Sequence, residues 1–305
     1  MSRRTLAIIL LVSLMLIAAV PSFAWKFASM ADSRGSNNGV NTVTLTKIVD
    51  LINSEKVDLV LFQGDAVGGT KDDAALSSQM DTWLAVTSKL NCPWYYTPGN
   101  HEISTGTSES ILRSKVDQPM NGPVGHKEMV FSFDHENAHF AAVNSNHYGA
   151  GHHMQRAWLA ADLAATKQPH RFVMGHYPAY PKGPHIKSSL DQAPSERDDF
   201  WNILNNSGVE MYFCGHEHLY ARSKHRSVYQ IINGTCGAPI SKNVKGTIGE
   251  YHYVVVDVDG NRVRCQTKSD AGEVLDTWSY EIDSRAASKT SSCCGVGASG
   301  STDCR

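Results

Sequence analysis

Five short polar segments, each placed directly after an apolar run, contain the residues of this chain that could do chemistry. They are Asp32-Ser33-Arg34, Gly64-Asp65, Gly99-Asn100-His101-Glu102, Gly175-His176 and Gly215-His216-Glu217-His218. Asp, Asn and His side chains offer oxygen and imidazole nitrogen atoms, a mixed ligand set that suits zinc, manganese or iron. The residue types therefore predict a metal-centred active site assembled from five separate parts of the chain.

The position of these segments after the apolar runs supports a single site. Each apolar run is predicted to be a buried strand, so each polar segment lies at the carboxyl end of a strand. In open α/β sheets that edge is where ligands bind. Taken alone, a Gly-Asp pair is usually a turn, and a His-x-His pair can lie in a solvated loop. Five such segments, each behind a buried strand, favour one shared site over five unrelated loops.

The elements that must position these segments alternate between strand and helix at first and are mostly strands later in the chain. The predicted strands are 25–31, 57–62, 93–96, 129–133, 139–143, 171–174, 209–213, 228–232, 253–257, 262–267 and 277–282. The predicted helices are 41–53, 73–90, 107–116, 155–166 and 196–206. This succession predicts an α/β fold in which two mixed sheets pack face to face with helices outside each sheet.

The beginning of the chain has the pattern of a secretory signal peptide over residues 1–24. Arg3 and Arg4 precede an apolar run, and Ser22-Phe23-Ala24 has the small-x-small pattern of a cleavage site. An uncleaved membrane anchor is the alternative, although the run is short for a spanning helix. We therefore expect an exported protein, periplasmic or secreted, with one domain over 25–283, a Ser/Gly/Cys-rich tail over 284–305 and no membrane span after signal removal.

The charge of the chain argues against one class of partner. The formal net charge is −2, and the sequence contains no basic run. Proteins that hold nucleic acid electrostatically need clustered Lys and Arg side chains. We therefore expect no strong binding of nucleic acid, whereas the oligomeric state stays open.

The order of the five segments resembles that of the calcineurin-like metallophosphoesterases: Asp-x-His, Gly-Asp, Gly-Asn-His-Asp/Glu, a lone His and Gly-His-x-His. The resemblance covers residues 25–282, and its most specific parts are 99–102 and 215–218. The segment Gln155-Arg156-Ala157-Trp158-Leu159 also resembles a Gln-x-x-Trp-Leu helix of the family. His176-Tyr177-Pro178 and the residues from His216 to Arg222 are similar to the purple acid phosphatase side of the family.

The resemblance implies a four-layer α/β/β/α sandwich with two divalent or trivalent metal ions, which would be Mn, Fe or Zn. It places the first ion on Asp32, Asp65 and His218, and the second on Asp65, Asn100, His176 and His216, with Asp65 bridging. It also implies hydrolysis of a phosphoester by a metal-activated hydroxide. In that reaction His101 would protonate the leaving oxygen, and Glu102 would orient the His101 ring.

One residue departs from the family pattern. The first segment of the family usually supplies a His ligand, and here Arg34 stands in that place; Arg cannot ligate a cation. The purple acid phosphatases replace this His with a Tyr three residues after the bridging Asp, but here that residue is Gly68. The first site is therefore expected to be weak, completed by water, or empty. Arg34 either grips a substrate phosphate or forms a structural salt bridge.

The small-molecule phosphoester that would be hydrolysed is not fixed by these residues. A secreted phosphomonoesterase is the first expectation, and a phosphodiesterase or nucleotidase of the same family is the alternative. A metal-binding or ligand-binding relative without catalysis is a further alternative, favoured only by Arg34. The loop histidines His147, His152, His153 and His185 are either pocket-lining residues or surface residues, and the surface is the ordinary place for most of them.

Overall fold

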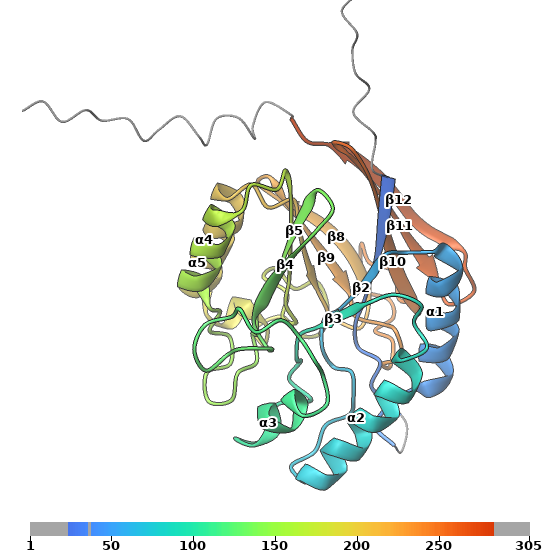
Figure 1. Ribbon diagram of the computed structural model, residues 1–305. Helices are drawn as coiled ribbons and strands as arrows, with labels where there is room; N and C mark the ends of the chain where they lie inside the picture. The colour runs from blue at the N-terminus through green and yellow to red at the C-terminus, as the bar shows by residue number, and fades with distance from the viewer. Residues whose placement is uncertain (1–23, 36–37, 284–305) are drawn as a thin grey trace, which may run out of the picture.

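The computed structural model describes residues 24–35 and 38–283 as two β-sheets with helices on their outer faces (Figure 1). Residues 1–23 of the expected signal peptide and the tail 284–305 lie outside the described residues. Within the described ranges, no helix is long and apolar enough to cross a membrane. The first strand begins at Ala24, directly after the undescribed segment.

The first sheet joins three parallel strands to an antiparallel meander. Its strands are β1 (Ala24–Met30), β2 (Leu59–Phe62), β3 (Trp94–Tyr96), β10 (His252–Asp259), β11 (Arg262–Ser269) and β12 (Val274–Glu281). Their order across the sheet is β12-β11-β10-β1-β2-β3. Because β1, β2 and β3 are parallel, their carboxyl ends lie at the same edge.

The second sheet is also mixed. Its strands are β4 (Phe131–His135), β5 (Ala138–Ala142), β6 (His170–Met174), β7 (Met211–Cys214), β8 (Tyr220–His225) and β9 (Val228–Asn233), in the order β4-β5-β6-β7-β9-β8. The four central strands are parallel, and the two edge strands are antiparallel to their neighbours. The carboxyl ends of β6 and β7 therefore also share an edge.

Alternating side chains hold the two sheets together. Phe27 and Leu61 of the first sheet belong to the same buried cluster as Phe172 and Phe213 of the second. The ring of Phe27 packs within 5.1 Å of Phe172 and 5.7 Å of Phe213, measured between ring centroids. The side chains that alternate with these along each strand point to the opposite, outer face of the sheet, as the two-residue period of a strand requires. Strands β2 and β7 are thus buried on both faces, which explains their continuous apolar runs, whereas β8, β11 and β12 keep exposed positions.

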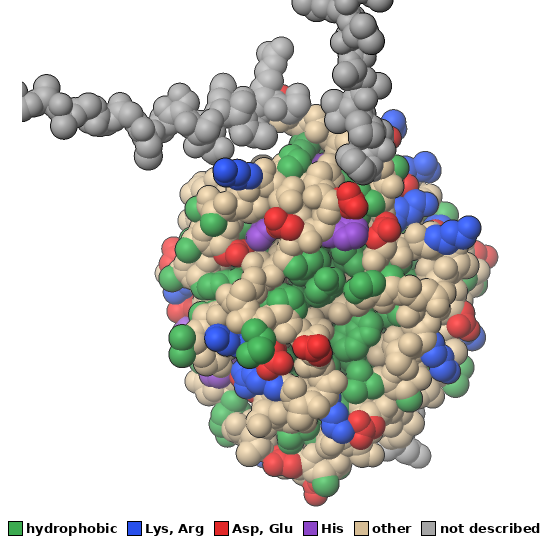
Figure 2. Space-filling view, in the orientation of Figure 1, with side chains coloured by type: hydrophobic (Ala, Val, Ile, Leu, Met, Phe, Trp, Pro, Cys, Tyr) green, Lys and Arg blue, Asp and Glu red, His purple; other side chains and the backbone are tan. Residues whose placement is uncertain are grey.

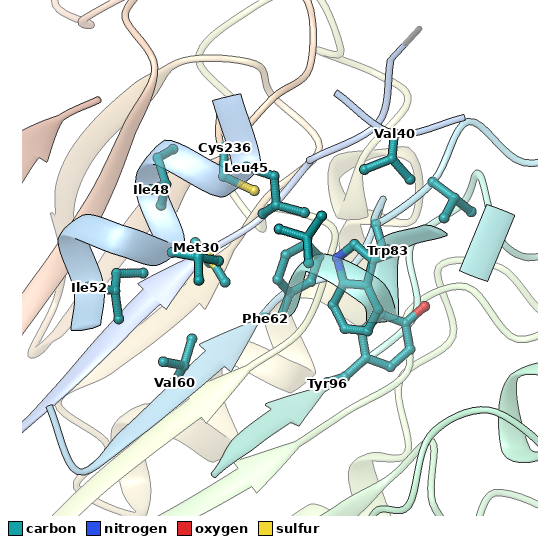
Figure 3. Packing of buried hydrophobic residues seen from close by; sticks show 14 of the residues in the cluster. Met30, Val40, Leu45, Ile48, Ile52, Val60, Phe62, Trp83, Tyr96 and Cys236 are labelled. Atoms are coloured by element: carbon teal, nitrogen blue, oxygen red, sulfur yellow. The ribbon is translucent and has the colours of Figure 1, made fainter. Parts of the chain in front are cut away.

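Helices close the outer faces. Helices α1 (Thr42–Glu55) and α2 (Asp73–Thr87) cover the first sheet, with the short α3 (Ser108–Arg113) beside α2, and α4 (Arg156–Ala165) and α5 (Pro194–Asn206) cover the second. Figure 3 shows Leu45, Ile48 and Ile52 of α1 directed at Met30 and Val60 of the sheet. A short 3₁₀ helix, Leu190–Gln192, precedes α5. The expected four-layer α/β/β/α sandwich is confirmed.

Three elements differ from the sequence prediction. The helix expected over 73–90 ends at Thr87, because the N–H groups of Lys89 and Leu90 bond three residues back and tighten the chain into a turn. The helix expected over 107–116 is only the six residues of α3. Strand β8 was not predicted as a separate element; it is an edge strand with exposed polar positions, so it lacks the apolar signal of a buried strand.

The visible surface carries charges of both signs. On the face shown in Figure 2, Lys and Arg side chains lie scattered among Asp and Glu side chains, with hydrophobic side chains between them. This pattern is ordinary for a protein surface, because apolar atoms contribute much of the accessible area of any folded chain.

The core between the sheets gives a test of the fold. Val256 of β10 is fully buried there, whereas Val43 of α1 is 69% exposed. Replacing Val256 by Ala should lower the free energy of unfolding by about 2 kcal/mol, through lost burial and a small cavity. The same change at Val43 should alter it by less than about 0.5 kcal/mol. Urea unfolding measures both; equal losses at the two positions would contradict this packing.

Candidate metal centre

The structure brings the six predicted ligands to one edge of the sandwich. Asp32 follows β1, Asp65 follows β2 and Asn100 follows β3, while His176 follows β6 and both His216 and His218 follow β7. A direct contact joins the sheets at this edge, since His176 Nδ1 donates to the backbone oxygen of Gln63 at 2.7 Å. The carboxyl ends of five parallel strands therefore converge, as the order of the segments predicts.

The backbone at three of these positions is strained. Asp32, Asp65 and His216 have φ angles of 60°, 50° and 68°, in the left-handed region that residues with a side chain seldom adopt. Each such residue costs on the order of 1 to 3 kcal/mol and persists where surrounding contacts enforce it. The backbone turns sharply at these three strand ends, which meet at the same edge of the sandwich.

Two glycines make room for the carboxylates. A Cβ atom on Gly99 would collide with Oδ1 of Asp65, and a Cβ atom on Gly215 would collide with Oδ2 of Asp32. These glycines come from β3 and β7 loops that cross close to the Asp side chains. The Gly-Asn-His-Glu and Gly-His-x-His segments therefore need Gly for close approach, and their other residues for chemistry.

Two groups of side chains offer ligand atoms that all lie within 4.8 Å of one another. One contains Asp65, His176 and His216, and the other contains Asp32, Asp65 and His218. Asp65 belongs to both, which is the division that the family resemblance implies. The amide oxygen of Asn100 lies 3.1 Å from Nε2 of His176, so it joins the first-named of these groups. We call this group, with Asn100, the asparagine group, and the other the Asp32 group.

Hydrogen bonds orient the histidine rings toward the carboxylates. His176 Nδ1 donates to Gln63 and His218 Nδ1 donates to the backbone oxygen of Pro239, at 2.7 and 2.9 Å. In the neutral ring each Nε2 then carries a lone pair, and it lies 3.3 Å from Asp65 Oδ1 in His176 and 3.5 Å from Asp32 Oδ1 in His218. A backbone acceptor behind a ring is the usual support of a metal-ligating histidine.

The electrostatics of the two carboxylates favour nearby positive charge. Burial raises the pKa of Asp32 well above its ordinary value, in spite of the neighbouring His176 ring. Burial acts the same way on Asp65, but the rings of His176 and His101, together with Arg34, outweigh it and lower the pKa of that carboxyl. Two enclosed carboxylates this close cannot both ionise at low cost unless cationic groups lie beside them.

The histidines of β7 are kept neutral. Burial, followed by the neighbouring His176, lowers the pKa of His216 far below its ordinary value. Burial and then the charge of Arg34 lower the pKa of His218 to about 4. Neutral imidazole is the form that binds metal ions, so both rings are in the state a cation needs at neutral pH.

The two groups do not fit a cation equally well. In the asparagine group, Nε2 of His216 is buried without a hydrogen-bond partner, and Nε2 of His176 lies 3.3 Å from Oδ1 of Asp65 and 3.1 Å from Oδ1 of Asn100. This donor set of oxygen and nitrogen fits Mn, Fe or Zn. In the Asp32 group, Nη2 of Arg34 lies 3.4 Å from Nε2 of His218, the atom that would bind the ion. The asparagine group fits a metal ion, and the Asp32 group is obstructed.

His101 has the position expected of it, but Glu102 does not. The His101 ring is held by its Nδ1–H, which donates to the backbone oxygen of Gly68 at 2.7 Å, and its Nε2 lies 3.8 Å from Asp65 Oδ2. Glu102 is fully buried and accepts from the N–H groups of Asp65, Val67 and Gly99. The expectation that Glu102 orients the His101 ring is therefore wrong, because its carboxylate is used up by the loop backbones.

Glu102 instead ties the loop after β2 to the loop after β3. Burial and then the charge of Asp65 raise the pKa of Glu102 to about 8, while the three N–H donors act in the opposite direction. A cation that neutralises Asp65 therefore favours the ionised Glu102 that accepts all three bonds. The loops that carry Asp65 and Asn100 are thus held together by this one carboxylate.

His185 and Glu217 are site residues to which the sequence assigned no definite role. The ring of His185 lies 4.1 Å from that of His216 and 5.9 Å from that of His218, measured between centroids. Buried Glu217 accepts from the backbone N–H groups of Gly183 and His185, and its Oε2 lies 3.5 Å from His185 Nδ1. Glu217 thus fixes the loop that carries a partly exposed imidazole to the rim of the centre.

The other loop histidines have separate environments. His152 stacks on Tyr177, whose ring lies 4.5 Å from that of His216. His147 pairs with Glu109, and His153 pairs with Glu196 near the surface. Only proximity in space distinguishes His185 from these residues. The one sequence signal for it is its place in the loop that follows His176, and loop composition does not reveal which histidine turns inward.

The three hydrogen bonds by which Glu102 joins the loops after β2 and β3, here called the Glu102 clamp, give a test of the centre. In Glu102→Gln, the amide N–H₂ would face a backbone N–H, so at least one hydrogen bond is lost. The free energy of unfolding should therefore fall by about 1 to 3 kcal/mol. Because the same bonds position Asp65 and Asn100, metal affinity should fall at least tenfold, measured by calorimetric titration.

Glu210→Gln is the matched control. Glu210 is also buried, and it bonds His170 and Tyr280 just before β7, at the opposite edge of the sheet. That variant should lose stability without losing metal affinity. If both variants bound metal as tightly as the parent protein, Glu102 would not be a clamp of the metal centre.

Comparison with known proteins agrees with this geometry. The calcineurin-like phosphoesterase family model matches residues 39–220, more than half of the chain. Purple acid phosphatase 21 of Arabidopsis thaliana is 29% identical over 204 residues, covering 63% of this chain and 44% of the relative. Tartrate-resistant acid phosphatase type 5 of Rattus norvegicus is 24% identical over 243 residues, covering 69% of this chain and 71% of the relative.

Solved structures share the fold. Purple acid phosphatase PPD1 from yellow lupin (Lupinus luteus) superposes with a TM-score of 0.71 at 17% identity, covering 92% of this chain and 58% of that one. A dimetal phosphatase from Danio rerio superposes with a TM-score of 0.65 at 14% identity, covering 85% and 99%. The chain spans less than half of the Arabidopsis relative. The sequence identities with the two solved structures, 17% and 14%, establish the fold alone. By its family match, the chain belongs to the calcineurin-like phosphoesterases, with distant similarity to the purple and tartrate-resistant acid phosphatases.

Proposed function

We propose that this protein is an exported, metal-dependent phosphomonoesterase. One observation supports the proposal: ligand atoms of Asp65, His176 and His216 lie within 4.8 Å of one another, with Asn100 against His176 and Nε2 of His101 3.8 Å from Oδ2 of Asp65. The names of the distant relatives, which are acid phosphatases, support the choice of a phosphoric monoester. Export stays a prediction from residues 1–24.

The ligand residues define what a cation would contribute. Held by the asparagine group, it would lower the pKa of a water molecule and neutralise charge on the phosphoryl oxygens. The side chains of Asp65 and His176 are almost wholly removed from solvent. In such a water-poor setting, fixed charges and dipoles act more strongly on a developing charge than they do in water.

His101 is the residue placed to move a proton. Its Nδ1–H is committed to Gly68, so a proton gained by the ring resides on Nε2, which faces the centre. From there it can pass to the oxygen of the leaving alcohol as the phosphorus–oxygen bond breaks. His101 thereby supplies the general acid, and the ring needs no carboxylate partner to be oriented.

His101→Ala tests the acid role. Loss of a positioned general acid should lower kcat about 10² to 10⁴-fold, whereas metal content per chain should stay the same, because His101 belongs to neither ligand group. His135→Ala, made where β4 ends at the opposite edge of the sheet, is the matched control and should leave kcat within a factor of two. Unchanged turnover in His101→Ala would remove His101 from the mechanism.

Substrate class is tested with p-nitrophenyl phosphate and bis-p-nitrophenyl phosphate. The monoester should be hydrolysed faster, activity should disappear after chelation, and added Mn, Fe or Zn should restore it. Preference for the diester would support a phosphodiesterase or nucleotidase instead. If metal-loaded protein hydrolysed neither ester, the chain would be a non-catalytic relative, and the proposed function would be wrong.

A further inference from the structure

The guanidinium of Arg34 lies among the ligand atoms of the Asp32 group. Its Nη2 is 3.4 Å from Nε2 of His218, and its Nε is 3.6 Å from Oδ2 of Asp65. These two acceptor atoms are the ones that a cation in the Asp32 group would need. Among the described residues, Arg34 is the one Lys or Arg side chain that forms a salt bridge with either Asp32 or Asp65.

The lone pair on Nε2 of His218 already accepts a hydrogen bond from Arg34. Nδ1 of the same ring donates to Pro239, so in the neutral ring only Nε2 can accept, and it accepts an N–H of Arg34. A nitrogen lone pair that accepts a hydrogen bond is not available to a metal ion. In the asparagine group, by contrast, Nε2 of His216 has no hydrogen-bond partner.

Charge works in the same direction as this geometry. A guanidinium is always positively charged and has no lone pair to donate, so it repels a cation a few ångströms away and cannot ligate it. It also supplies the positive charge that buried Asp65 requires. The negative charge that would attract an ion to the Asp32 group is therefore partly neutralised before any ion arrives.

Main-chain contacts hold Arg34 in this place. Its N–H donates to the backbone oxygen of Asp65 at 3.2 Å, and the residue forms an isolated bridge with Val40. Next to it, the hydroxyl of Ser33 donates to the backbone oxygen of Ala66 at 2.7 Å. The loops after β1 and β2 are thus joined, and the guanidinium begins from a fixed point beside Asp65.

Asp32 also has a structural role, which does not involve a cation. Both of its carboxylate oxygens contact the N–H of His216, at 3.2 and 3.0 Å. This contact enforces the left-handed backbone of His216 described above. The presence of Asp32 is thereby explained as an anchor for the loop after β7.

We propose that this centre holds one metal ion, in the asparagine group, and that the guanidinium of Arg34 takes the place of the second. Because 23% of the Arg34 side chain remains exposed, N–H groups not used by His218 can donate to a phosphoryl oxygen. This last point rests on the proposed function; the number of metal ions does not.

Metal content measured on the full chain tests the proposal. The protein is stripped with a chelator, equilibrated with Mn²⁺ or Zn²⁺, freed of unbound ion and assayed by elemental analysis. The parent protein should hold one ion, and Arg34→His, which exchanges the cation for a neutral ligand, should hold two. Arg264→His, made at an exposed position of β11, is the matched control and should hold one. Two ions in the parent protein, or one in Arg34→His, would overturn the proposal.

A second pair of variants distinguishes the groups without touching Arg34. His218→Ala removes a ligand of the Asp32 group only, so it should leave the content at one ion, whereas His176→Asn should reduce it below one. If His218→Ala lost an ion, the Asp32 group would bind metal in the parent protein and the proposal would fail. Circular dichroism establishes that each variant is folded before its metal is counted.

The phosphate contact is measured separately with inorganic phosphate as the probe. Arg34→Met should weaken phosphate binding to the metal-loaded protein at least tenfold, while Arg264→Met should not change it. Unaltered binding in Arg34→Met would remove the phosphate role. One ion without phosphatase activity would contradict the proposed function alone, and two ions with activity would contradict the proposed centre alone.

Discussion

Two enclosed carboxylates at the junction of the sheets, Asp32 and Asp65, are the constraint on which the rest of this centre depends. A charged carboxylate inside a protein is costly unless donors and positive charge lie beside it. Asp32 takes the N–H of His216, and Asp65 takes the N–H of His101 and lies near Arg34. Each of these contacts crosses between loops. The requirement to satisfy two carboxylates therefore ties the ends of β1, β2, β3 and β7 into one unit.

The packing of the sandwich stabilises these joined strand ends. Because β2 and β7 are buried on both faces and β1 is buried along most of its length, these strands resist shifts that would relieve strain at their ends, and the left-handed residues Asp32, Asp65 and His216 persist there. Glu102 adds three hydrogen bonds, which its carboxylate accepts from backbone N–H groups of two loops. The packing of the layers thus offsets the cost of the strained loops, and these loops hold the oxygen and nitrogen atoms in fixed directions.

The sequence predicts most of this arrangement because its signals are local. Apolar runs mark strands buried on both faces, and parallel order brings residues such as Asp65 and His176 to one edge. What it could not predict depends on contacts between distant segments. Glu102 lies beside His101 in sequence, yet its carboxylate turns to backbone N–H groups 35 and 37 residues away. The inward position of His185, which the sequence left open between pocket and surface, and the strand β8 were not predictable for the same reason, since neither an inward-turned loop histidine nor a polar edge strand has a periodic signature.

Arg34 shows how one residue can change the charge balance of a site without changing the fold that carries it. A metal ion is a high, exchangeable charge that also activates water; a guanidinium is a lower, permanent charge that donates hydrogen bonds in fixed directions. Placed against Asp65 and His218, it balances buried carboxylates before any ion binds. In the proposed centre, the fold would depend less on a bound metal ion for its stability, and a water molecule would be activated in the asparagine group alone. The arrangement divides two tasks, charge balance and activation of water, between a side chain and an ion.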